Sequence, residues 1–218
     1  MEFPPPKDKC ILLFPGKEVK VKDQVFFQTG NDGLHQWESG IVLSRFLVHE
    51  GIQGKVLELG SGTGLAGISC AKFNNCESVT LTDYHSEVLE NIAQNIDQNQ
   101  VNASLAYLDW TNPQSYLNRK FNYVVGSDLV YDGAPIKELA CCIKEHLETS
   151  GKCFIVMPDK RKMTQKFIEE LENIGMLVES SALKEEFYYS SPSRETQEGY
   201  RDFRELTMHT YMLYTIAT

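Results

Sequence analysis

The chain has 218 residues, enough to bury one hydrophobic core, and this length favours one domain over two. Hydrophobic residues make up 42% and charged residues 23%, a globular composition that excludes a disordered or fibrous chain. The formal net charge of -9 opposes capture of a phosphate backbone, so we expect no nucleic acid partner and favour a cationic one, although acidic charge also serves solubility alone.

The first 50 residues read as an N-terminal appendage followed by a helix. Alternating apolar residues over 11–27, around Pro15-Gly16, predict two short strands. Helical spacing over 39–48 predicts the first helix, which Gly51 ends. A proline run and charges occupy the start of the chain, so we expect no signal peptide and a cytoplasmic, or also nuclear, location.

After Gly54, short apolar runs alternate with amphipathic stretches, a pattern typical of β-α-β units. The predicted buried strands are 56–59, 79–81, 105–108, 123–125 and 154–157. The predicted helices are 65–73, 86–98 with Ser86 as N-cap, 136–147 and 163–173.

Beyond Gly175 the apolar period returns to two, over 177–183 and 207–216, which predicts an antiparallel hairpin at the end of the sheet. The predicted fold is therefore α/β, with a doubly wound, mostly parallel seven-stranded sheet and this C-terminal hairpin. Residues 184–205 read as a long surface loop, a candidate for substrate contact.

The six cysteines include no C-x-x-C pair and stand beside no histidine at a ligand spacing, so we expect no metal site. No apolar stretch approaches the roughly 20 residues of a membrane span, so we expect no membrane partner.

A glycine turn carries the strongest local signal. It places Gly60, Gly62 and Gly64 between a predicted strand and a predicted helix, where doubly wound sheets bind nucleotides. The dinucleotide pattern G-x-G-x-x-G is not met, because Leu65 stands at its third glycine, and a Walker lysine is absent. A purely structural turn stays open as the alternative.

Two carboxylates flank this turn and favour a ligand without phosphate. Asp83 ends the next strand, where an acidic side chain accepts hydrogen bonds from ribose hydroxyls. Glu58 directly precedes the turn and suits an amino group or a positively charged sulfonium. S-adenosylmethionine combines a ribose, an amino group and a sulfonium, and it is the predicted cofactor.

With Glu58, Gly60, Gly62 and Gly64 in the form E-x-G-x-G-x-G, the chain resembles the class I, seven-strand methyltransferases with their Rossmann-like fold. These enzymes place a side chain against the adenine at the end of the third strand, which implies Trp110 here. The alternative for Trp110 is a place in the core.

The acceptor side depends on the end of the fourth strand. The Asn/Asp-Pro-Pro-Tyr/Phe motif of nucleic acid amino-methyltransferases is absent, and Asp128-Leu129-Val130-Tyr131 instead resembles the D-x-x-Y motif of methyltransferase family 16. Those protein-lysine methyltransferases modify chaperones, translation elongation factors and calmodulin. A second block, residues 37–43, resembles the family segment ahead of the glycine turn.

The resemblance covers about residues 34–159 and implies a set of site residues. The implied cofactor contacts, with Glu58 added from its own chemistry, are Trp37, Glu58, Gly60, Ser61, Gly62, Asp83, Trp110 and Ser127. Asp128 and Tyr131 would face the substrate lysine as catalytic residues; the alternative is that they serve as a helix N-cap and a core tyrosine.

We therefore expect residues 1–218 to form one methyltransferase domain, with 51–218 as its catalytic core. Its predicted activity is methyl transfer from S-adenosylmethionine to a lysine ε-amino group of a protein such as a chaperone, an elongation factor or a calmodulin-like protein, by a monomer. The alternatives are a small-molecule N-methyltransferase and a noncatalytic adaptor. One difficulty stands: Asp128 would capture the ammonium but raise the lysine pKa, so a water chain or the sulfonium charge would have to offset it.

Overall fold

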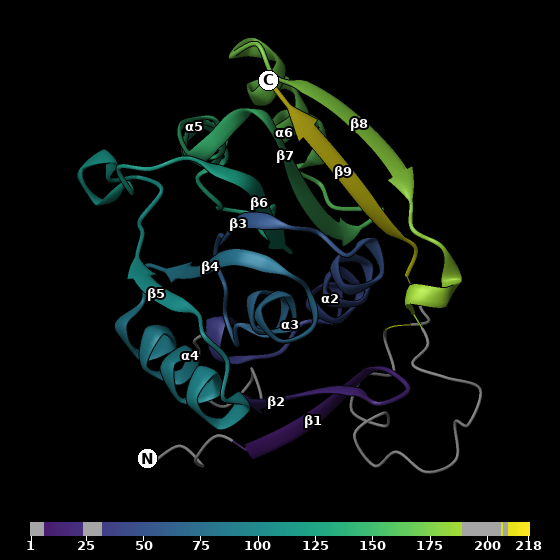
Figure 1. Cartoon of the computed structure of the whole chain (residues 1–218). Helices are drawn as coiled ribbons and strands as arrows, with labels where there is room; N and C mark the ends of the chain where they lie inside the picture. The colour runs from purple at the N-terminus through teal and green to yellow at the C-terminus, as the bar shows by residue number, and fades with distance from the viewer. Residues whose placement is uncertain (1–6, 24–31, 189–205, 207–208) are drawn as a thin grey trace, which may run out of the picture.

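The short apolar runs after Gly54 form one seven-stranded sheet in the computed structural model, which describes residues 7–23, 32–188, 206 and 209–218 (Figure 1). The strand order is β5-β4-β3-β6-β7-β9-β8. The strands are β3 (Gly54–Glu58), β4 (Cys76–Asp83), β5 (Ser104–Tyr107), β6 (Phe121–Ser127), β7 (Leu147–Pro158), β8 (Leu177–Ala182) and β9 (Tyr211–Ala217). Strands β3 to β7 pair in parallel, and β9 pairs antiparallel with both β7 and β8. The predicted fold class is confirmed.

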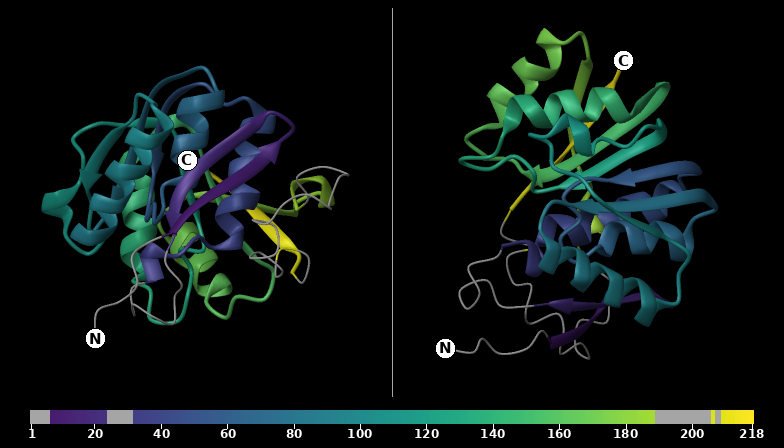
Figure 2. Two further views of the ribbon diagram at one scale, coloured as in Figure 1. Left: turned by 90° about the horizontal axis from the view of Figure 1, so that it is seen from below. Right: turned by 90° about the vertical axis from the view of Figure 1, so that its left-hand side faces the viewer.

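Helices cover both faces of the sheet because its strands are apolar on both sides (Figures 1 and 2). On β3, Val56 joins the core on one face and its neighbour Leu57 joins the core on the other. One face carries α2 (Glu38–Glu50), α3 (Leu65–Phe73) and α4 (Ser86–Asn99), and the other α5 (Ile136–His146) and α6 (Thr164–Asn173). Short 3-10 turns are η1 (Asp32–Leu34), η2 (Pro113–Ser115) and η3 (Glu185–Phe187).

The N-terminal hairpin, β1 (Lys7–Phe14) and β2 (Lys17–Asp23), packs on the outer side of α2, α3 and α4 (Figure 2). Two asparagines of α4 anchor it: Asn95 Oδ1 accepts from the backbone N–H of Lys22 at 2.8 Å, and Asn99 Oδ1 from that of Lys20 at 3.0 Å. The two predicted strands are confirmed as far as Asp23, and residues 24–27 lie outside the described residues.

Three local predictions were wrong. Ser86 is the first residue of α4 and not its N-cap; Asp83 instead accepts from the two N–H groups just ahead of that helix. Leu147 begins β7 and does not end α5. Strand β5, predicted at 105–108 as a buried strand, is not fully buried: Tyr107 is 49% exposed, and β5 is an edge strand among the described residues.

The segment after β8 also differs from the predicted surface loop. Phe187 and Tyr188 are buried, at 4% and 7% exposure. The Tyr188 hydroxyl donates to the carbonyl of Leu183 and accepts from the N–H of Tyr211, each at 3.0 Å. This start of the loop is therefore part of the core, and residues 189–205 lie outside the described residues.

Arg45 on α2 joins this segment to the hairpin. Its side chain is buried, and its two terminal nitrogens donate to the carbonyls of Phe187 at 3.0 Å and Leu12 at 2.9 Å. We expect Arg45→Met to lower the free energy of unfolding by about 2–4 kcal/mol, because it leaves both carbonyls without their donor. Urea denaturation measures this. Lys137→Met, on the exposed face of α5, is the control, and an equal loss in both variants would contradict the anchoring role.

Candidate active site

The glycine turn after β3 adopts a backbone that only glycine takes easily. Gly60 and Gly62 have φ of 53° and 55°, in the left-handed region. A Cβ on Gly60 would lie 2.8 Å from Leu129 and 3.2 Å from Trp110, so side-chain packing excludes it. A Cβ on Gly62 would approach only the carbonyl of Gly33, at 3.3 Å. Gly60 therefore serves packing, whereas Gly62 leaves bare backbone at the edge of an open space.

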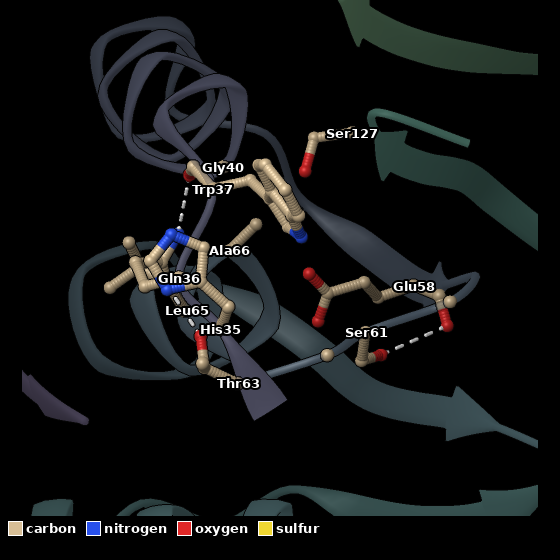
Figure 3. Close-up of a pocket in the computed structure, with 12 residues that line it drawn as sticks. His35, Gln36, Trp37, Gly40, Glu58, Ser61, Thr63, Leu65, Ala66 and Ser127 are labelled. Carbon is tan, nitrogen blue, oxygen red and sulfur yellow. Dashed lines mark hydrogen bonds between the residues drawn. The ribbon is translucent and has the colours of Figure 1, made fainter. Parts of the chain in front are cut away.

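That space is a pocket between the glycine turn, the start of α2 and the end of β6 (Figure 3). The pocket and its open mouth together enclose about 310 Å³. Six predicted cofactor residues line it: Trp37, Glu58, Gly60, Ser61, Gly62 and Ser127. Figure 3 shows the ring of Trp37, the residue just before α2, and the carboxylate of Glu58 at the end of β3 directed into the same space.

Glu58 is a buried carboxyl group in this pocket, with 4% of its surface exposed. Its Oε2 accepts from the N–H of Gly67 in the first turn of α3 at 3.0 Å. Burial outweighs this hydrogen bond and raises the pKa of Glu58 to about 8. In the free protein at pH 7 the group is therefore mainly protonated, and a cationic ligand would favour its ionised form.

Asp83 ends β4 beside the glycine turn, as predicted. Its Oδ2 accepts from the N–H of Gly62 at 3.3 Å, and its Oδ1 accepts from those of Tyr84 at 2.8 Å and His85 at 3.2 Å. Burial raises the pKa of Asp83 above its ordinary value. The carboxylate does not line the pocket itself, but it fixes the backbone that does.

Six lining residues were not predicted: His35, Gln36, Gly40, Thr63, Leu65 and Ala66. Gln36 connects the glycine turn, the start of α2 and strand β2. Its side chain accepts a hydrogen bond from the Thr63 hydroxyl and donates one to the carbonyl of Trp37 at 2.8 Å. Its backbone N–H donates to Asp23 of β2 at 2.7 Å. Its contacts join residues far apart in the sequence, so no local pattern indicated it. Of these six residues, Thr63 could have been predicted, because it lies inside the glycine turn that the sequence identified.

The acceptor side begins directly after the pocket. Ser127 ends β6 and lines the pocket, and Asp128 follows with φ of 56°, uncommon for a residue other than glycine. The N–H of Asp128 donates to the carbonyl of Val156 on β7 at 3.0 Å, and its Oδ1 pairs with Arg161 Nη2 at 2.5 Å. Tyr131 is 44% exposed. Asp128 and Tyr131 do not line the pocket, so their facing a lysine stays a prediction.

Trp110, predicted to contact adenine, lies against Gly60 and packs partly buried against the core on the α5 side of the sheet. It is not among the residues that line the pocket, and its adenine contact also stays a prediction.

The described residues contain no group of three or more His, Cys, Asp or Glu side chains placed to hold a metal ion. Among them, too, no helix has the length and apolar character that a bilayer crossing requires.

Residues 15–174 match the lysine methyltransferase family. The chain belongs to this family, methyltransferase family 16. This family 16 chain is 37% identical over 131 residues to a histidine protein methyltransferase 1 homolog of Dictyostelium discoideum, which covers 56% of this chain and 42% of that protein. It is 32% identical over 162 residues to a calmodulin-lysine N-methyltransferase of Arabidopsis thaliana, covering 69% of this chain and 53% of that protein. The chain thus spans about half the length of these curated relatives.

Among solved structures, the chain is similar to the glycopeptide N-methyltransferase MtfA complexed with S-adenosyl-L-methionine. The TM-score is 0.62 at 14% identity, over 82% of this chain and 94% of that one. At this identity the likeness confirms the class I methyltransferase fold.

The chemistry of the pocket fits S-adenosylmethionine, the predicted cofactor of this family 16 chain. Glu58 supplies a carboxyl group that a cationic ligand would ionise, and Ser127 supplies a hydroxyl group, whereas the Ser61 hydroxyl bonds to the backbone of Glu58 and Thr82. None of the described residues that line the pocket is lysine or arginine, the side chains that most often bind phosphate. The pocket therefore suits a ligand with cationic and hydroxyl groups.

Proposed function

We propose that this protein is an S-adenosylmethionine-dependent protein-lysine N-methyltransferase. The observation that carries the proposal is the sequence Ser127-Asp128: the serine lines the cofactor pocket, and the residue that directly follows it is a largely buried carboxylate. A carboxylate there suits a cationic acceptor such as lysine and opposes a phosphate-bearing one. The family match and the name of the calmodulin-lysine relative support the same acceptor.

In this proposal the cofactor contacts come from the pocket and its supports. The central part of the cofactor is held by Trp37, the glycine turn and Ser127. Asp83 accepts hydrogen bonds from the ribose hydroxyls, and Trp110 packs against the adenine. Glu58 faces the amino or sulfonium charge. Bound S-adenosylmethionine supplies a methyl group activated by its sulfonium.

The chain's own residues position the acceptor. Asp128 accepts a hydrogen bond from the lysine amine and fixes its direction, and Tyr131 forms one wall of its approach. The lysine nitrogen would form a bond to the methyl carbon while the carbon–sulfur bond breaks and the electron pair of that bond passes to sulfur. The methylated amine would then lose a proton to solvent. Since this is one in-line displacement, positioning is the main task of the protein.

The ribose assignment can be tested alone. We expect Asp83→Asn to weaken S-adenosylmethionine binding about 10- to 100-fold, because the charged acceptor is lost and the single amide oxygen can accept from Gly62 or from Tyr84 and His85, but not from both sides. Isothermal titration calorimetry measures this. Asp97→Asn, on the exposed face of α4, is the matched control, and unchanged affinity in Asp83→Asn would remove Asp83 from the cofactor site.

The acceptor class is tested with methyl-labelled S-adenosylmethionine in a whole-cell extract, separated afterwards into protein, RNA and small-molecule fractions. We expect label in protein, on lysine by mass spectrometry of the labelled band. Calmodulin is one purified acceptor to try, since a relative is named for it. Label on histidine, or confined to RNA or small molecules, would overturn the lysine assignment, and no label at all would favour the noncatalytic alternative.

A further inference from the structure

The acceptor site has an electrostatic difficulty that Asp128 alone does not resolve. A lysine with a pKa near 10.4 is neutral in only about one molecule in a few thousand at pH 7, and only the neutral amine attacks. A lone carboxylate beside it favours the ammonium form and raises the lysine pKa further. A second group is needed that offsets this charge without removing the hydrogen-bond acceptor.

Arg161 is placed to do this. It lies in the turn between β7 and α6, and its Nη2 is 2.5 Å from Asp128 Oδ1. The side chain of Asp128 is 11% exposed and that of Arg161 35%, so solvent screens the pair only in part. Within the described part of the chain, Arg161 is the sole ionic partner of Asp128.

The ion pair engages one of the two carboxylate oxygens of Asp128. Oδ1 of Asp128 is engaged by Arg161, while Oδ2 makes no hydrogen bond to the described residues. Backbone contact with Val156 holds the carboxylate in place, and Arg161 Nε is buried without a partner in the described structure. Arg161 is thus bound at this site mainly through Asp128, and the two side chains act as one unit.

Other charged or titratable groups lie on the elements around the pair. They are Tyr131, Asp132, Asp159, Lys160, Lys162 and His209. All six are exposed, and none forms an ion pair with Asp128 within the described ranges. The guanidinium, always protonated near neutral pH, is the nearest fixed positive charge.

We propose that Arg161 is a positioning residue of the acceptor site: it neutralises Asp128, so that the carboxylate orients the substrate amine without stabilising its ammonium form. This inference rests on the proposed lysine acceptor. Asp128 Oδ2 then accepts from a neutral amine, whose lone pair is left for the methyl group. Arg161 thus counters the rise in lysine pKa caused by Asp128, a task assigned from the sequence to a water chain or to the sulfonium charge.

The test is the pH dependence of methyl transfer into whole-cell extract protein at saturating labelled S-adenosylmethionine. In the wild type the initial rate rises with pH as the bound lysine loses its proton. We expect Arg161→Gln to move this rise upward by about one pH unit, so that the rate is about tenfold lower at every pH below the lysine pKa and the two profiles converge only above the shifted pKa, which the pH series must reach. Arg161→Lys, which keeps the charge, should restore the wild-type profile.

Two controls separate this role from a structural one. Lys162→Gln removes the same charge from the exposed neighbour and should leave the profile unchanged. Calorimetry should give wild-type cofactor affinity for every variant, and Arg161→Met replaces Arg161→Gln if the latter lacks a cooperative thermal transition.

A rate that stays lowered by the same factor above the shifted lysine pKa, or that rises at pH 7, would overturn the proposal for Arg161 while leaving the lysine acceptor standing. A wild-type protein that labels no protein lysine would overturn the proposed function, and this inference with it.

Discussion

Asp128→Asn is expected to lower methyl transfer to protein by at least about 100-fold while S-adenosylmethionine affinity stays within about twofold. The amide oxygen stays paired with Arg161, so an NH2 donor replaces Oδ2 and the substrate amine loses its acceptor and its alignment. Asparagine is the better replacement, since the position has φ of 56° and asparagine tolerates the left-handed region. Labelled transfer measures the first quantity and calorimetry the second.

The matched control is Asp132→Asn, an exposed aspartate four residues further along the same loop, which should keep full activity. Parallel loss of transfer and cofactor affinity in Asp128→Asn would show instead that the carboxylate holds the end of β6 in place. This outcome is a real alternative, because Asp128 also forms the ion pair with Arg161.

The parts of the site that the sequence predicted are those with a local cause. Strand, glycine turn and helix follow one another within residues 54–73, so this short segment was enough to predict both the glycine turn and the role of Glu58 beside it. Asp83 was predictable because the carboxyl ends of neighbouring parallel strands meet at one edge of the sheet.

The parts that were missed depend on contacts between distant residues. Gln36 contacts Thr63 and Asp23 because the hairpin packs on the helices, a tertiary arrangement that no local pattern shows. Arg161 meets Asp128 across 33 residues, because β7 lies beside β6 in the sheet. Phe187 was predicted to lie in a surface loop, because no pattern in the neighbouring sequence indicates its packing against Phe46 of α2.

Glu58→Gln is expected to remove a pH dependence from the stability of the free protein. The ordinary pKa of 4.5 in the unfolded chain rises to about 8 in the folded one, because burial disfavours the charge. Between these values the unfolded chain has lost the proton that the folded chain keeps, so raising the pH favours unfolding. Wild-type stability should therefore fall by about 2 kcal/mol from pH 6 to pH 8 through this group, with little further loss above pH 8.

Glutamine keeps an oxygen for the N–H of Gly67 but does not titrate, so urea denaturation of Glu58→Gln across this range should lack that fall. Glu77→Gln, exposed on β4, should behave as the wild type. Parallel pH profiles for wild type and Glu58→Gln would mean that Glu58 is already ionised in the free protein.

The same raised pKa predicts that cofactor binding by the wild type releases a proton near pH 7. A cationic ligand beside Glu58 stabilises the carboxylate and lowers its pKa, so the buried acid ionises as the pocket fills. Calorimetry in buffers of different ionisation enthalpy should detect this proton, and Glu58→Gln should bind without releasing it. Burial thus prepares Glu58 to carry a negative charge only when a positive one is present.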